Sequence, residues 1–292
     1  MAKGRELKGR IRSVENTRKI TRTMEMVATS KMKRAQDRVV AARPYANSLA
    51  EVIASLYSPE LAEQFRLLRQ PAEIKKAAVI LLTSNRGLAG GFNANLIKEA
   101  RNLLGRLDKE GAQTILRIVG RKGLGYFRYV GRPIESSRTD FTDRPTADNA
   151  ADLVNDFIGQ FERGEIDAVY VVYAKFNSAL STPPTTLKVL PVTPPEKKSG
   201  ESEGLRHDYL LFPSAEAILA QLLPLYVRNS IYRALVETAA AEQGARRTAM
   251  KSATDNAGDI INVLRRTYNR ARQAQITQEI AEIVGGSAAL EG

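Results

Sequence analysis

The chain has 292 residues, of which 43% are hydrophobic and 26% charged, and its formal net charge is +12. That length provides roughly two domains of average size with a sizeable core, and the absence of Cys excludes disulfide scaffolds, Cys-based zinc sites and Cys nucleophiles. No apolar run is long enough to span a membrane, and no signal-peptide core follows the first residues, so we expect a chain that faces the cytosol.

The first predicted element is one long helix, over residues 1–57. Alternating steps of four and three residues from Leu7 to Leu56 reach fifteen positions, of which twelve are apolar, as in the seam of a coiled coil. The three polar exceptions are consecutive: Arg18, Thr21 and Glu25. An apolar stripe lies one position away from them: Ile20, Met24 and Val27. We therefore expect the packed face of the helix to drift locally.

Most of the positive charge belongs to this helix. Residues 1–45 hold 13 Lys and Arg against 4 Asp and Glu, a balance of +9. A solvated helix face explains such a balance, and so does an anionic partner such as nucleic acid, an acidic protein surface or phospholipid. Pro44 is the one residue that could kink the helix, because it lacks a backbone donor.

The hydrophobic period changes over residues 74–193, where short apolar runs alternate with helical patterns. Strands are predicted at residues 76–83, 113–119, 168–173 and 185–192, and helices at 93–107 and 147–161, the second starting near Thr146. This alternation predicts an α/β domain, Rossmann-like, with a largely parallel sheet. Residues 194–208 are polar and are predicted to form a flexible loop.

A second long helix is predicted within residues 209–292, ending at a C-cap formed by Gly285 and Gly286. Alanine recurs every fourth residue from Ala241 to Ala257, which leaves a ridge that another helix can approach closely. An apolar stripe continues beyond it: Ile260, Leu264, Ala271, Ile276, Ile280 and Ile283. The fold predicted is thus an α/β central domain plus an antiparallel two-helix coiled coil made by the N- and C-terminal helices.

Motifs for chemistry are weak. The loop at residues 84–93, with Gly87, Gly90 and Gly91, lies where a phosphate-binding loop would, but it lacks the G-K-[ST] ending, so a tight glycine turn is favoured. The glycines Gly120, Gly123 and Gly125 have the reverse of the dinucleotide-binding spacing and are also interpreted as a turn. His207, the single His, lies beside Asp208 in the predicted polar loop. This position favours a surface role for His207 over a catalytic one. We therefore predict no catalytic residue, no metal site and no cofactor.

The two ends of the chain resemble a known family. Residues 20–38, ITRTMEMVATSKMKRAQDR, strongly resemble the N-terminal helix of the gamma subunit of F-type ATP synthases. Residues 273–286, QAQITQEIAEIVGG, are similar to its C-terminal signature, and residues 242–256, EQGARRTAMKSATDN, to the stretch before it. The loop at residues 87–93 resembles the glycine loop of that family. The resemblance covers essentially the whole chain in order.

The resemblance implies a non-catalytic rotor subunit. Its partners would be the alpha and beta subunits, which form the surrounding alpha3-beta3 hexamer, together with the epsilon subunit and the membrane c ring. Proton flow through the c ring would turn this chain, and its asymmetric surface would drive the beta-subunit sites in sequence. It would act at the cytoplasmic face of the bacterial inner membrane, held there only through the complex.

The resemblance also implies three sets of site residues. Residues that contact the beta subunits and couple rotation to catalysis would be Met24, Glu25, Val27, Ser30, Lys31, Met32, Arg246, Arg272, Gln273, Thr277 and Glu279. Residues in the apolar bearing at the top of the hexamer would be Ile280, Ile283, Val284 and Leu290. Residues at the foot, near the c ring and epsilon, would be His207, Asp208 and Tyr209.

Two alternatives remain open from the residues alone. One is a basic coiled-coil protein that binds nucleic acid, although residues 1–44 contain no aromatic side chain for stacking on bases. The other is a nucleotide-binding enzyme that uses the loop at residues 87–91. The rotor interpretation predicts no nucleic acid among the partners.

Overall fold

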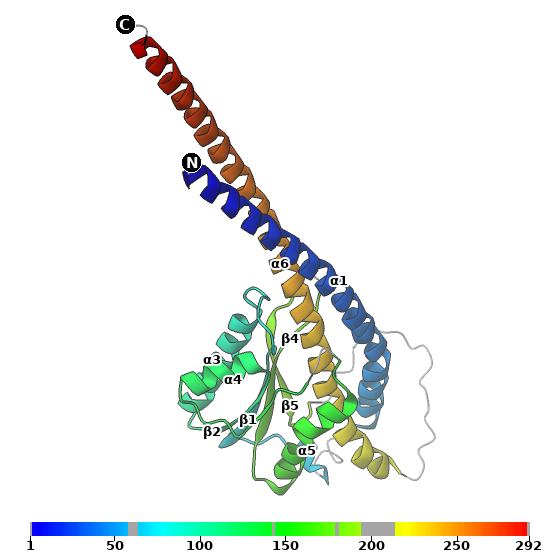
Figure 1. Ribbon diagram of the computed structural model, residues 1–292. Helices are drawn as coiled ribbons and strands as arrows, with labels where there is room; N and C mark the ends of the chain where they lie inside the picture. The colour runs from blue at the N-terminus through cyan, green and yellow to red at the C-terminus, as the bar shows by residue number, and fades with distance from the viewer. Residues whose placement is uncertain (1, 58–63, 142–143, 179–180, 194–213, 291–292) are drawn as a thin grey trace. The chain divides into compact units, whose positions relative to one another are not determined.

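The computed structural model describes residues 2–57, 64–141, 144–178, 181–193 and 214–290, with side chains from residue 5 to residue 285 within these ranges. The chain forms two compact units. The central unit comprises residues 29–245, and the terminal unit comprises the chain up to residue 28 together with the chain from residue 246 onward. Two long helices, α1 (Ala2–Leu56) and α6 (Ala215–Leu290), each contribute to both units (Figure 1).

The central unit contains one five-stranded sheet with the strand order β3-β2-β1-β4-β5. The strands are β1 (Lys76–Leu82), β2 (Gln113–Val119), β3 (Ser136–Arg138), β4 (Ala168–Ala174) and β5 (Pro184–Leu190). The first four pair in parallel, and β5 is antiparallel to β4. The predicted α/β class and largely parallel sheet are confirmed, and four of the strands are close to their predicted ranges.

Helices and a short 3-10 turn cover both faces of this sheet. They are η1 (Arg66–Leu68), α3 (Phe92–Lys109), α4 (Arg121–Tyr129) and α5 (Ala147–Arg163). Alternate residues of β1 separate two cores, because successive strand side chains point to opposite faces. Val79 belongs to the core shared with α3 and α4, whereas Ile80 belongs to the core shared with α5, η1 and the first part of α6.

Helix α5 begins where the sequence predicts. The Thr146 hydroxyl accepts a hydrogen bond from the Asn149 backbone, and the Asn149 side chain accepts one from the Thr146 backbone. This reciprocal pair satisfies two backbone donors that have no partner within the helix. At the other end Gly164 adopts φ +77°, which a glycine tolerates without strain.

A buried arginine fastens α5 to the sheet. The Arg117 guanidinium on β2 lies 3.0 Å from the Glu135 carboxylate, donates to the Leu153 carbonyl at 2.9 Å and stacks 4.1 Å above the Phe157 ring. This arginine is not singled out by the sequence. Its charge is tolerated in the core because an acid, a carbonyl and a ring face surround it.

Two parts of the central unit differ from the sequence-based expectation. The turn predicted at Gly120, Gly123 and Gly125 is confined to Gly120, since α4 starts at Arg121 and includes the other two glycines. Strand β3 was not predicted, because it has three polar residues and no alternation. The predicted loop at residues 194–208 lies outside the described residues.

In the terminal unit the two long helices pair antiparallel. The Thr21 and Thr254 hydroxyl oxygens are 2.8 Å apart, and Arg265 Nη2 lies 2.7 Å from the Glu15 carboxylate. The contact nearer the N-terminus of α1, at Glu15, is made by the residue nearer the C-terminus of α6, Arg265. This order of contacts confirms the predicted antiparallel pairing within this unit.

The drift predicted for the packed face of α1 is not found at Thr21. Thr21 keeps its seam position and is 9% exposed, whereas Ile20 is 60% exposed and Val27 is 52% exposed. A threonine is tolerated in the seam because its hydroxyl reaches Thr254 and the carbonyl of Arg18. The hydrogen bond therefore keeps the polar residue inside and leaves its apolar neighbours on the surface.

The C-cap predicted at Gly285 and Gly286 is also wrong, since α6 continues to Leu290. A helical glycine costs about 1 kcal/mol relative to alanine, which weakens a helix without ending it. Helix α1 likewise continues through Pro44. No helix in the described part of the chain has the length and apolarity needed to cross a membrane.

The Thr21–Thr254 contact gives a first prediction. Thr21→Val or Thr254→Val alone should cost about 0.5–1 kcal/mol, because the remaining hydroxyl loses its partner across the seam and keeps only a carbonyl of its own helix. The double variant should be close to the wild type, since two apolar groups of the same shape then meet. Urea unfolding of the four proteins measures this coupling as a double-mutant cycle, and additive costs would contradict a hydrogen-bonded pair.

Candidate functional site

On α1, the residues predicted to contact the beta subunits differ in accessibility. Met24 and Glu25 are half-buried in the terminal unit, and Val27 is exposed. In the central unit Ser30 is exposed, Lys31 is half-buried, and Met32 is buried among the residues of this chain. The surface that a partner can reach directly on this stretch is therefore formed by the exposed members of the set.

On α6, the predicted contact residues form two groups. Arg246 is buried within the chain. The remaining four are exposed, and Glu279 accepts a hydrogen bond from Gln275 one turn earlier at 2.9 Å. They are Arg272, Gln273, Thr277 and Glu279. These polar side chains point into solvent, so they can form adjustable hydrogen bonds and ion pairs with a neighbouring protein surface.

An apolar surface follows directly on α6. Ile280, Ile283 and Val284 are all more than half exposed, with Ile283 at 72%. Exposed large apolar side chains spaced three to four residues apart lie on one side of a helix and are typical of a protein contact surface. The side chain of Leu290 is not described, and His207, Asp208 and Tyr209 lie outside the described residues.

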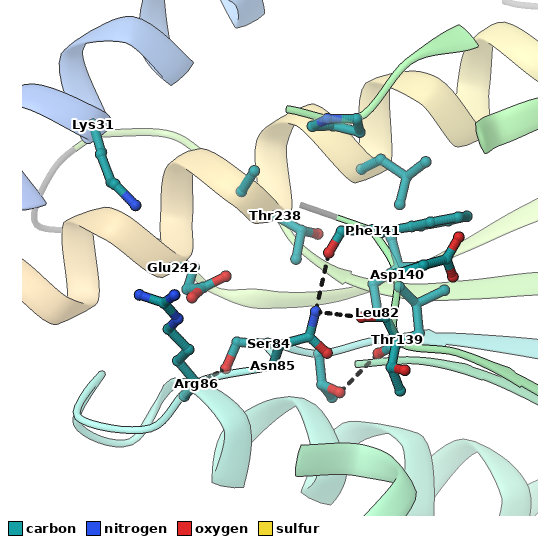
Figure 2. Close-up of a pocket in the computed structure, with 15 residues that line it drawn as sticks. Lys31, Leu82, Ser84, Asn85, Arg86, Thr139, Asp140, Phe141, Thr238 and Glu242 are labelled. Atoms are coloured by element: carbon teal, nitrogen blue, oxygen red, sulfur yellow. Dashed lines mark hydrogen bonds between the residues drawn. The ribbon is translucent and has the colours of Figure 1, made fainter. Parts of the chain in front are cut away.

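A cavity of about 250 Å³ lies in the central unit, at the carboxyl ends of β1, β2 and β3 (Figure 2). Its walls come from the loop after β1, the loop after β3, α6, and Lys31 of α1. Ser84 Oγ donates to the Arg86 carbonyl at 2.6 Å, and the Asn85 side-chain amide donates to the carbonyls of Thr139 and Phe141 at 3.0 Å each. The first bond stabilises the loop after β1 itself, and the Asn85 amide holds the two loops together.

The glycine loop beside this cavity is a closed turn. Gly90 has φ +56°, and even Leu88 has φ +61°. The Ser84 backbone donates to Asn93 Oδ1 at 3.0 Å, which ties the strand end to the start of α3. The arrangement agrees with the tight-turn interpretation that the sequence favoured for these glycines.

One of the two acids that line the cavity, Asp140, is paired with an arginine. Arg138 donates two hydrogen bonds to the Asp140 carboxylate, at 2.9 and 2.8 Å, and these bonds lower the pKa of Asp140. Asp140 is therefore ionised at neutral pH and holds no proton to donate as a general acid. Among the described residues no group of three or more acidic or His side chains could hold a metal ion.

Comparisons with known proteins agree over the whole chain. A family model described as ATP synthase matches residues 3–290. The chain is 64% identical to the ATP synthase gamma chain of Gemmatimonas aurantiaca over 292 residues, which is 100% of both chains. It is 43% identical to the ATP synthase gamma chain of Frankia casuarinae, over 98% of this chain and 97% of that one.

Solved structures of similar fold come from rotary complexes. A chain from the central stalk and c-ring structure of the Tetrahymena thermophila mitochondrial ATP synthase aligns with TM-score 0.61 and 26% identity, over 80% of this chain and 99% of that one. A chain from the Euglena gracilis mitochondrial ATP synthase rotor shares the fold, with TM-score 0.65 and 18% identity over 94% and 99%. None of these matches supports a nucleic-acid-binding protein. With full-length relatives of this identity, the chain belongs to the family of ATP synthase gamma chains, the rotor subunits of the central stalk.

Proposed function

We propose that this chain turns inside a hexamer of ATP synthase alpha and beta subunits and couples proton flow through a c ring to ATP synthesis or hydrolysis. The observation that carries this proposal is the 64% identity to an ATP synthase gamma chain over the full length of both chains. The chain contributes no catalytic residue itself, and it acts at the cytoplasmic face of a bacterial inner membrane through the complex.

The exposed parts of the two long helices support this role. Arg272, Gln273, Thr277 and Glu279 offer polar groups to loops of the beta subunits, and the exposed Val27 and the half-buried Met24 offer a stretch of α1. Polar contacts between exposed groups are individually weak, which suits a surface that must make and break contacts at every turn. We therefore assign coupling to these residues.

The end of α6 has a different role in this proposal. Ile280, Ile283 and Val284 are apolar and exposed in the chain alone, so they suit the apolar bearing at the top of the hexamer, in which the helix turns. Leu290 continues this segment. His207, Asp208 and Tyr209 are assigned to the foot beside the epsilon subunit and the c ring, on the family resemblance alone.

Reconstitution from purified subunits tests the proposed function. Alpha and beta subunits should hydrolyse MgATP continuously only when this chain is added, because the rotor is needed to move the three beta sites through their states in sequence. A complex that hydrolyses ATP equally well without it would contradict the proposal. Retention of nucleic acid at moderate salt, with no binding to alpha and beta, would instead favour the nucleic-acid alternative.

A further inference from the structure

The sheet has an opening at its carboxyl edge, between β1 and β4. Pairing between these strands ends at Leu81 and Val172, and the chain after β1 turns toward β2, where the Thr83 backbone donates to the Val119 carbonyl at 2.8 Å. Strand β4 continues past this point. The backbone N–H of Lys175 donates to the Pro183 carbonyl at 3.0 Å, on the side of β5.

The N–H groups of Ala174 and Phe176 therefore point to the opposite side, where β1 has ended, because the direction of the backbone donors alternates along a strand. A buried backbone donor needs an acceptor. Helix α6 provides both acceptors. The Thr238 hydroxyl lies 3.3 Å from the Ala174 nitrogen, and Glu237 Oε2 lies 3.2 Å from the Phe176 nitrogen.

The carboxylate of Glu237 is 2% exposed, and its charge is balanced on the same helix. Glu237 Oε1 accepts a hydrogen bond from Arg233 Nε at 2.8 Å, one turn earlier. A buried carboxylate that accepts hydrogen bonds from both an arginine and a backbone N–H is held firmly in position. Breaking either bond would leave a buried charge or a buried donor without a partner. Two consecutive residues of α6 are thus fixed to the end of one strand.

The same stretch of α6 packs against both faces of the sheet. Ala234 and Leu235 belong to the core shared with α5, whereas Val236 and Ala240 belong to the core shared with α3 and α4. In open α/β sheets, the crevice outside the carboxyl ends of neighbouring strands with opposite crossovers is where ligands bind. Here side chains of α6 occupy that position, and Thr238 also lines the adjoining cavity (Figure 2).

We propose that Glu237 and Thr238 form the joint through which torque passes between the α/β body and α6. This inference rests on the proposed rotor function. The joint connects the sheet to a helix that continues without a break to Leu290, so a rotation of the body is delivered to the part of α6 assigned to the beta subunits. Both are positioning residues, since neither contacts a substrate.

A matched pair of variants tests the joint in the assembled complex. Thr238→Val keeps the methyl group and loses the acceptor, whereas Thr238→Ser keeps the acceptor and loses the methyl group. Hydrogen exchange at the Ala174 amide, which donates to Thr238, should rise about three- to tenfold in Thr238→Val and stay near the wild type in Thr238→Ser. Glu237→Gln should accelerate exchange at the Phe176 amide, because its acceptor is charged in the wild type.

The second readout is proton translocation per ATP hydrolysed. It should fall in Thr238→Val, fall further in Glu237→Gln, and stay unchanged in Thr238→Ser. The control is Thr267→Val, an exposed threonine of α6 whose hydroxyl bonds only the Val263 carbonyl of its own helix. If Glu237→Gln does not assemble, the two Thr238 variants decide the question alone.

Three outcomes would overturn the joint. The first is a lower proton-to-ATP ratio in Thr238→Ser than in Thr238→Val, because coupling would then depend on the packing of the methyl group and not on the hydrogen bond. The second is unchanged coupling in a variant whose amides exchange faster. The third is unchanged exchange in Thr238→Val. In all three cases the wild-type complex still couples, so only the joint is refuted. A wild-type complex that does not couple at all would instead contradict the proposed function.

Discussion

Gly120→Ala should prevent stable folding of the α/β body. Gly120 has φ +97°, and a Cβ atom there would lie 2.1 Å from the Thr83 carbonyl oxygen and 2.7 Å from the Thr83 hydroxyl oxygen. The obstacle is the backbone at the end of β1, which cannot move without opening the sheet. We expect a loss of more than about 4 kcal/mol of unfolding free energy, at the upper end of single substitutions. Urea unfolding of the full chain measures it.

Two other glycines separate the causes of this loss. Gly111 also has a positive φ, +78°, but a Cβ atom would meet nothing within 4 Å, so Gly111→Ala should cost only about 1–2 kcal/mol of conformational strain. Gly125 lies inside α4 with open space around it, and Gly125→Ala should stabilise by about 0.5–1 kcal/mol. Equal costs at Gly120 and Gly111 would refute the steric explanation.

Met24→Lys should uncouple the complex more than it impairs assembly. Met24 is half-buried on α1 in the terminal unit, within the stretch assigned to beta-subunit contact. A lysine there adds a cation that faces a moving partner, and an extra ion pair in one rotor position must be broken at every turn. Close charge pairs across protein interfaces are worth enough to slow rotation by about tenfold.

The measurement is the ratio of proton pumping to ATP hydrolysis in reconstituted vesicles, with the amount of assembled complex determined in parallel. Val40→Lys is the matched control, since Val40 is an exposed apolar residue of the same helix outside the assigned contact residues. A Met24→Lys complex that pumps as well as Val40→Lys would remove Met24 from the coupling surface.

Much of the fold could be predicted because the sequence is periodic. The apolar runs of β1, β2 and β4 and the helical spacing of α3 and α5 are each long enough to identify the element. Helix α4 was missed because two of its nine residues are glycines, which resemble a turn until the tertiary contacts are known.

The candidate site was less predictable. The family resemblance supplied the contact residues. The seam pattern of α1 already places Met32 on the packed face, but no local pattern distinguishes the buried Arg246 from the exposed Arg272 and Thr277. Burial depends on which residue of the other helix lies opposite, and that information is long-range. Glu237 shows the same limit, since nothing in its neighbourhood along the sequence reveals a backbone donor sixty-one residues away.

The buried pair of hydroxyls at Thr21 and Thr254 also has a consequence for alignment. An all-apolar seam would tolerate a slip of one helix along the other by a heptad, since apolar side chains replace one another at modest cost. After such a slip the two hydroxyls would no longer meet, so the polar pair favours one register, as a buried asparagine does in other coiled coils. The pair thereby fixes the axial position of residues of α1, including Met24, relative to α6 in the terminal unit.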